Sequence, residues 1–192
     1  MTDIMPGSFG LSVIGGKLGW WIDKGQAFVE QQDYKFTHAF LVLDDETVIE
    51  AQPGGARITP LSVYTSRPEG TVIFTDEPVQ RELDAYYTRK RGWNAGADLH
   101  EFEARLREKL VDFGRSLNGT PYNYIDYLAI ALDRFGFRPR LIRKRMQRHD
   151  RLICSQLVDY VYTMAGIHLF DDGRDPFDVT PGDLEGWIRT YG

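Results

Sequence analysis

The chain has very little cysteine: Cys154 is the only one in 192 residues. A single thiol cannot form an internal disulfide, and it cannot supply the several cysteines of a thiolate zinc site. No apolar run is long enough to cross a bilayer, and the first residues do not read as a charged region followed by an apolar export signal. These absences predict a soluble, unexported protein without a disulfide framework.

The charge balance of the chain is acidic, with a formal net charge of −5. This charge argues against a general nucleic-acid-binding protein, because such proteins neutralise phosphates with an excess of Lys and Arg. Hydrophobic residues make up 42% of the 192 residues, which is enough to bury one sizeable core. The sequence therefore predicts a single domain over residues 1–192.

The two halves of the chain differ in their periodicity. Strand-forming residues dominate from Phe36 to Thr75, and the predicted strands, at 36–43, 47–51, 56–59 and 71–75, are separated by turns as in an antiparallel meander. After Pro78, apolar residues recur at three- and four-residue steps, which predicts helices at 79–90, 98–117, 124–135 and 152–165. In the second of these, Asp98 is the expected N-cap. A strand cluster followed by helices predicts the α+β class, with helices packed on an antiparallel sheet.

Cys154 stands at the expected start of the last of these helices. The free backbone N–H groups and the macrodipole of a helix N-terminus favour a thiolate over a thiol, which is how a nucleophile is made. A free cysteine in an apolar helix is also commonly a small buried hydrophobic residue. Residues 152–162 alone favour this structural interpretation, and the choice depends on what could activate the thiol.

A catalytic thiol needs an imidazole as proton acceptor and a polar group that orients the imidazole. Among the four histidines, His38 is distinctive because it lies in an apolar strand, where a polar ring must find a partner. If residues 44–46 close a tight hairpin, positions that sum to 88 or 90 face each other, and Glu50 lies opposite or diagonal to His38 on one face. Gln52 shares that face and is the weaker candidate for the orienting role. A chance polar pair in a half-exposed hairpin is the alternative interpretation.

Taken together, these motifs resemble a known family. Three segments follow the order of NlpC/P60 proteins, Pro121-Tyr122, Cys154-Ser155-Gln156-Leu157-Val158 and Thr180-Pro181-Gly182-Asp183-Leu184. The strand Thr37-His38-Ala39 and the segment Val48-Ile49-Glu50-Ala51 precede them instead of following. The chain therefore resembles a circularly permuted NlpC/P60 protein of the papain-like superfamily, which includes cysteine peptidases, amidases and acyltransferases. Ile153 departs from the Asp that is usual there in unpermuted members, and Ile125-Asp126 departs from a Gly-rich turn.

This resemblance implies a papain-like fold in a circularly permuted order and assigns roles to its residues. Cys154 would be the nucleophile, His38 the general base and Glu50 the orienting group. Tyr122 matches a family tyrosine near the oxyanion, and Tyr124 would be a neighbour that lines the substrate pocket. The implied reaction is acyl transfer through a covalent acyl-enzyme, which needs no metal and no organic cofactor.

Three functions fit this resemblance. The first is a thiol hydrolase that cleaves an amide bond in a peptidoglycan stem peptide or a similar small peptide, from a bacterium or a phage, which places the protein in the cytoplasm or with the phage. The second is an amidase or acyltransferase that acts on an acyl lipid. The third is a binding or structural module that has lost turnover, and the presence of Cys154, His38 and Glu50 argues against it. The sequence does not separate the first two.

A basic stretch between Arg134 and Arg151 contains Arg143, Lys144 and Arg145 and almost no acidic residues. It is a solvated surface segment in one interpretation. In the other, it is a lid beside the nucleophile that attracts an anionic substrate such as a cell-wall fragment or a lipid head group. Few aromatic residues are interleaved with these charges, so a nucleic-acid partner is not expected.

Overall fold

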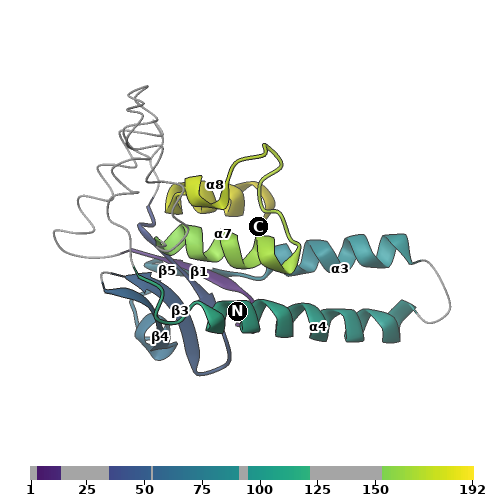
Figure 1. The fold of residues 1–192 in the computed structure, drawn as a ribbon, viewed down its shortest axis with the longest axis horizontal. Coiled ribbons are helices and arrows are strands. Elements are labelled where there is room, and N and C mark those ends of the chain that lie inside the picture. Colours follow the sequence, from purple (N-terminus) through teal and green to yellow (C-terminus); the bar gives the residue numbers. More distant parts are fainter. Residues whose placement is uncertain (1–3, 14–34, 53, 91–94, 122–152) are drawn as a thin grey trace.

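The computed structural model describes residues 4–13, 35–52, 54–90, 95–121 and 153–192. It is a mixed α and β structure built on a five-stranded antiparallel sheet (Figure 1). The strands are β1 (Phe9–Ser12), β2 (His38–Val42), β3 (Thr47–Gln52), β4 (Gly55–Pro60) and β5 (Val72–Thr75). The α+β class expected from the sequence is confirmed.

The sheet has the strand order β4-β3-β2-β1-β5. The expected hairpins β2–β3 and β3–β4 are present, but the meander is wrong for its last strand. β5 pairs with β1 at the opposite edge, and β1 was not expected at all. The short helix α2 (Ser62–Thr65) follows β4. The next strand, β5, then pairs with β1 instead of with β4.

The helices agree with the periodic segments but differ at their ends. They are α3 (Glu77–Arg89), α4 (Ala95–Ser116), α7 (Cys154–Ala165) and α8 (Pro181–Tyr191), with a 3-10 turn η1 (Pro176–Asp178) before α8. The expected N-cap role of Asp98 is wrong, because α4 begins three residues earlier and places Asp98 in its first turn. The sequence did not predict α8, and the helix expected at 124–135 lies outside the described residues.

Both faces of the sheet are covered, by different elements. One face carries Phe9, Leu11 and Leu41 into the main core, which α7, α4 and α8 complete (Figure 1). The other face carries a smaller cluster, to which α2 contributes Tyr64. Since side chains alternate along a strand, β2, β3 and β5 contribute to both clusters, whereas β1 and β4 contribute apolar side chains to the main core alone.

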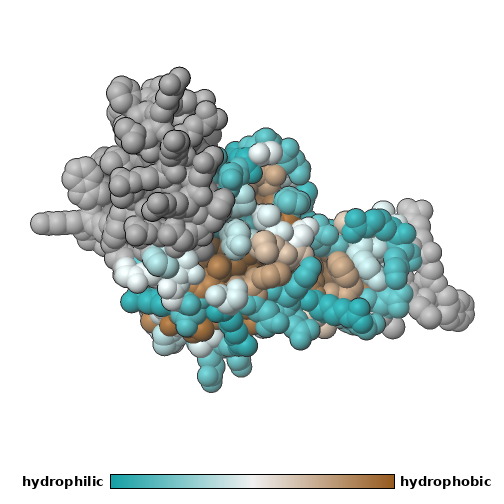
Figure 2. All heavy atoms as spheres, in the orientation of Figure 1, coloured by the Kyte–Doolittle hydropathy of each residue, from teal (hydrophilic) through white to brown (hydrophobic). Residues whose placement is uncertain are grey.

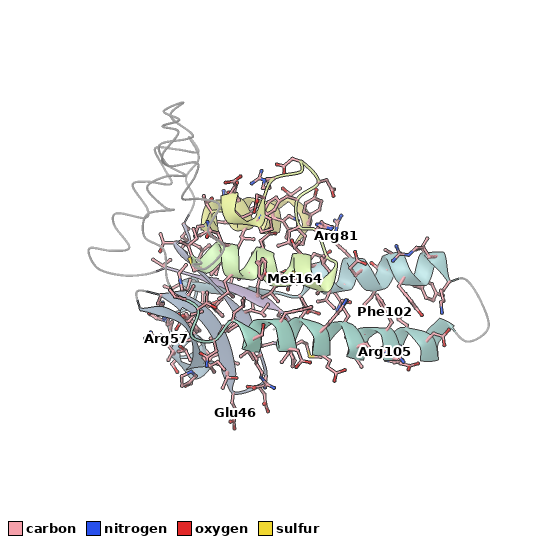
Figure 3. The ribbon with its side chains drawn as sticks, in the orientation of Figure 1. Glu46, Arg57, Arg81, Phe102, Arg105 and Met164 are labelled. Carbon is pink, nitrogen blue, oxygen red and sulfur yellow. The ribbon has the colours of Figure 1, made fainter. Side chains whose placement is uncertain are left out.

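Helices α3 and α4 form an arm that extends beyond the sheet (Figure 1). In Figure 3, Phe102 lies between the two helices, where its ring stacks on Tyr86 with centroids 4.1 Å apart. The base of the arm is tied to the sheet by a buried ion pair between Arg107 and Asp76, whose Nη2 and Oδ2 atoms are 2.7 Å apart. Figure 2 shows apolar atoms gathered where α7 runs beside α4, and Met164 is exposed there. None of the described helices is both long enough and apolar enough to cross a membrane.

Gly10 gives a test of the smaller cluster, because the Phe40 ring lies across it. A Cβ atom at Gly10 would be 2.3 Å from Phe40 Cζ, so we expect Gly10→Ala to lower the free energy of unfolding by about 1–3 kcal/mol through overpacking. Urea titrations measure this loss. The matched control is Gly114→Ala in α4, where the nearest atoms are the flexible ends of Leu41 and Leu43 and alanine is the better helix former. An equal loss in both variants would contradict the packing argument.

Candidate active site

The register of the hairpin β2–β3 brings His38 and Glu50 together. Phe40 pairs with Glu50, so paired positions sum to 90, one of the two registers expected, and His38 lies diagonal to Glu50 on the same face. His38 Nε2 is 2.7 Å from Glu50 Oε2. Both residues are buried, with 2% and 0% of their surface exposed, so this contact is not a chance pair at the surface.

Glu50 is surrounded by hydrogen-bond donors. Thr59 Oγ1 donates to Oε1 at 2.6 Å, and the guanidinium of Arg57 lies 3.7 Å from the same oxygen. The Tyr64 hydroxyl and Gln52 Nε2 both donate to Oε2, which also contacts His38. A buried carboxylate is tolerated only when such partners replace its lost hydration, and here they do so on both oxygens.

Gln52 lies on the expected face but contacts Glu50. Its own side-chain oxygen accepts from Arg57 Nη2 at 2.6 Å. In the structure the His38 ring is therefore held by Glu50, and Gln52 supports Glu50 from the solvent side.

Cys154 is the first residue of α7, and its helix N-terminus is buried. The preceding Ile153 N–H donates to the side chain of Gln156 at 3.1 Å, and the first helical bond runs from Leu157 to Ile153. The backbone N–H groups of the first turn have no acceptor within the helix, and they are next to the thiol. Cys154 is itself 2% exposed, as a structural cysteine would be. Its burial alone does not distinguish the two interpretations of the thiol.

The neighbour of Cys154 bears on this choice. The Cys154 side chain and its charge raise the pKa of the His38 imidazole, which places the thiol next to the ring. Since His38 Nε2 is occupied by Glu50, Nδ1 is the ring nitrogen that remains for the thiol. Helix α7 covers the sheet face opposite to the one that carries His38, so the two side chains meet at the end of the sheet, where His38 is the first residue of β2.

The electrostatics of this cluster favour a charged imidazole. Burial lowers the pKa of His38, but the hydrogen bonds and charges of Cys154 and Glu50 raise it to about 9. Burial raises the pKa of Glu50, but His38, Thr59 and Tyr64 lower it to about 2. At neutral pH the pair is therefore imidazolium and carboxylate, and the carboxylate does not take the proton.

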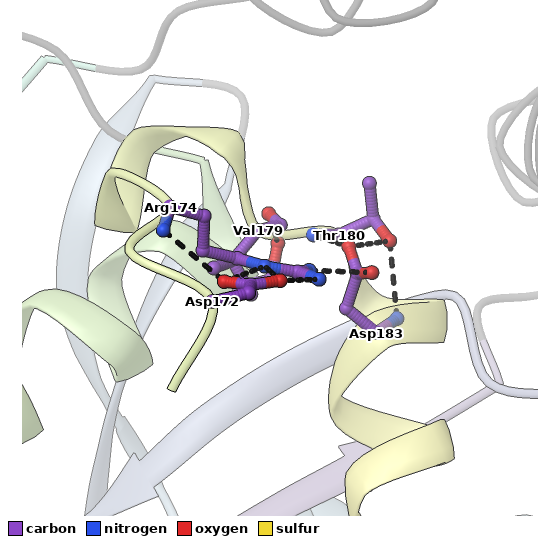
Figure 4. Close-up of polar contacts among 6 residues, drawn as sticks. Asp172, Arg174, Val179, Thr180 and Asp183 are labelled. Carbon is purple, nitrogen blue, oxygen red and sulfur yellow. Dashed lines mark hydrogen bonds and ion pairs between the residues drawn. The ribbon is translucent and has the colours of Figure 1, made fainter. Parts of the chain in front are cut away.

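The start of α7 is tied to the start of α8. Ser155, next to the thiol, donates from Oγ to the carbonyl oxygen of Val179 at 2.7 Å. Thr180 and Asp183 then form a capping box at the N-terminus of α8, and Arg174 bridges Asp183 to Asp172 (Figure 4). The segment Thr180-Pro181-Gly182-Asp183-Leu184 is thus the beginning of a helix, and it holds the first turn of α7.

The chain just before His38 is also held by α8. Glu185 Oε2 accepts hydrogen bonds from the backbone N–H of Lys35 at 2.7 Å and of Phe36 at 2.9 Å. Thr37 N then donates to Ser12 O at 3.1 Å, which begins the pairing of β2 with β1. One buried carboxylate therefore fixes where the strand that carries His38 begins.

Sequence reasoning missed Tyr64 and Thr59. Thr59 could have been found by extending the hairpin arithmetic to the next pair of strands, since the observed register of β3 and β4 puts Arg57 opposite Glu50 and Thr59 opposite Val48. Tyr64 had no such signal, because it lies in a helix of four residues that has no measurable periodicity. Tyr122, Tyr124 and the basic stretch with Arg143, Lys144 and Arg145 lie outside the described residues.

Comparison with known proteins adds no family. No protein-family model matches the chain, and no curated protein sequence is significantly similar to it. Within the described ranges, no three His, Cys, Asp or Glu side chains are grouped so that they could hold a metal ion. The interpretation of the site therefore rests on its own geometry.

The shifted pKa values predict how stability depends on pH. The pKa of His38 is raised from 6.5 to about 9, so its contribution to the free energy of unfolding is complete below pH 6.5 and is lost as the pH rises through 9. The pKa of Glu50 is lowered from 4.5 to about 2, so its contribution to the free energy of unfolding is present above pH 4.5 and is lost as the pH falls through 2. We expect the free energy of unfolding of the wild type, minus that of the double variant His38→Gln, Glu50→Gln, to be largest between pH 4.5 and 6.5. Urea titrations within this range and on both sides of it measure the difference, and a difference that stays constant above pH 6.5 and below pH 4.5 would contradict the ion pair.

Proposed function

We propose that this protein is a thiol hydrolase of the circularly permuted, papain-like NlpC/P60 type. It cleaves an amide bond in a peptidoglycan stem peptide or a similar small peptide. The observation that carries the proposal is the position of the His38 ring, which contacts Glu50 through Nε2 and also contacts Cys154 at the N-terminus of a helix. The antiparallel sheet with the cysteine helix packed on it, and the order of His38, Glu50 and Cys154 along the chain, support the permuted type.

The charges of the site suggest how the reaction runs. The Cys154 thiolate attacks the amide carbonyl carbon, and the N–H groups at the start of α7 stabilise the oxyanion. The His38 imidazolium gives its proton to the leaving nitrogen, the C–N bond breaks, and a thioester remains. Water then attacks the thioester, His38 accepts its proton, and the acid leaves as the thiolate is restored. Glu50 stays ionised throughout and holds the ring.

Alkylation tests the activated thiol without a substrate. We expect iodoacetamide to modify wild-type Cys154 readily at pH 6, because the imidazolium stabilises the thiolate, and His38→Ala to slow this reaction at least tenfold, about 1.4 kcal/mol. Mass spectrometry of the intact protein measures the rate. His100→Ala is the matched control, since His100 is an exposed histidine on α4. Equal rates in the wild type and His38→Ala would return Cys154 to a buried structural role.

The substrate class is tested by trapping the acyl-enzyme. Muropeptides from muramidase-digested bacterial cell walls should acylate Cys154 and release a shorter peptide, whereas Cys154→Ala should be inactive and His38→Ala slower by about 10²–10⁴-fold. Glu50→Gln should lie between His38→Ala and the wild type, since a neutral amide still contacts the ring. A thioester formed only with an N-acylated lipid would replace the peptide substrate by a lipid. No adduct with either class would contradict a hydrolase.

A further inference from the structure

Tyr64 is the one side chain of α2 that is buried, with 1% of its surface exposed. Its hydroxyl donates to Glu50 Oε2, and its oxygen lies 3.1 Å from His38 Nε2. The His38 N–H therefore faces two oxygens, that of Glu50 at 2.7 Å and that of Tyr64. The hydroxyl is placed to donate to the carboxylate and to accept from the ring.

The Tyr64 hydroxyl is a fixed donor. Burial, together with the charge of Glu50 and its hydrogen bond, raises the pKa of Tyr64 well above its ordinary value. The hydroxyl therefore keeps its proton at neutral pH. A permanent donor on Oε2 favours the ionised form of Glu50, which is the form that His38 needs.

The ring of Tyr64 is held by its packing as well. It stacks on Phe40 with centroids 3.9 Å apart and planes at 19°, and the guanidinium carbon of Arg67 is 4.9 Å from its centroid. Arg67 Nη1 donates to the carbonyl oxygen of Val13 at 3.0 Å, which ties the end of α2 to the end of β1. Gly10 leaves the space in which the Phe40 ring lies. The hydroxyl therefore has little freedom to leave Glu50.

We propose that Tyr64 is a positioning residue of the site. It acts through Glu50, by fixing the rotamer and the charge of the carboxylate that orients His38. Thr59 and Arg57 hold Oε1, whereas on Oε2 the described residues offer, besides Tyr64 and His38, the donor Gln52, which is half-buried and bonded to the exposed Arg57. What the oriented imidazole then does rests on the proposed function, whereas the effect on Glu50 is a property of the folded chain.

The substitution Tyr64→Phe tests this role, because it removes the hydroxyl and keeps the ring that stacks on Phe40. A hydrogen bond to a charged group is worth about 1.5–3 kcal/mol, so its loss should raise the pKa of Glu50, which is about 2 in the wild type, by about one to two units. The 13C resonance of Glu50 Cδ, assigned with Glu50→Gln, reports this titration directly. The iodoacetamide rate of Cys154 at pH 4 should fall at least threefold in the same variant.

The matched control is Tyr162→Phe. Tyr162 is also fully buried, and its hydroxyl donates to the carbonyl oxygen of Gly7 at 2.5 Å, so the control loses a buried hydrogen bond without touching Glu50. A merely structural role predicts that both variants lose stability and that neither moves the Glu50 titration. A Glu50 midpoint within 0.3 unit of wild type in Tyr64→Phe, or an equal shift in Tyr162→Phe, would overturn the proposal.

A second measurement needs no substitution at Tyr64. In the wild type, the Tyr64 hydroxyl proton should give a slowly exchanging, downfield proton resonance with a cross-peak to the His38 ring, and Glu50→Gln should shift it upfield. The absence of such a resonance at low temperature would count against the contact. Neither readout requires turnover, so a shifted Glu50 in a chain that forms no acyl-enzyme would leave the role of Tyr64 standing and reject the hydrolase.

Discussion

The hydrogen bond between His38 and Glu50 is the interaction on which the rest of the site depends. A carboxylate with no exposed surface is costly unless its charge is neutralised and its oxygens are hydrogen-bonded. That requirement explains the polar side chains that β4 turns toward Glu50 and the short helix that brings Tyr64 over it. Replacing one partner would leave a buried charge under-solvated, which is why a polar network in this position is either complete or strongly destabilising.

The same network decides which group carries the proton. A carboxylate that receives several donors is a weak base, so it stabilises the imidazolium without deprotonating it. The imidazole therefore enters the proposed reaction already charged, as an acid for the leaving group, and becomes a base only when water attacks the thioester. The role of general base that the family resemblance implies for His38 would thus belong to the second half of the cycle.

Short-range patterns in the sequence predicted the part of the site that one hairpin builds. The turn at 44–46 fixes the register, and the register puts His38 and Glu50 on one face. β1 was missed because it has only four residues, and its Gly10 lowers the strand propensity that a pattern can detect. The pairing of β5 with β1, and the contact of Tyr64 with Glu50, join residues that are far apart in the chain or lie in a single helical turn. No local period encodes such contacts.

The positions of the covering elements explain why the thiol and the imidazole meet only at the end of the sheet. The α7 helix belongs to the core on one face, whereas Tyr64 belongs to the cluster on the other face, on which Glu50 also lies. A residue in the middle of β2 could not contact both α7 and Glu50, because its side chain points to one face of the sheet only. His38 can, since it is the first residue of the strand and α7 begins beside it. The contacts of Ser155 with Val179 and of Glu185 with the backbone at Lys35 and Phe36 then act together: one fixes the start of α7, the other fixes the start of β2, and α8 and its N-cap connect the two.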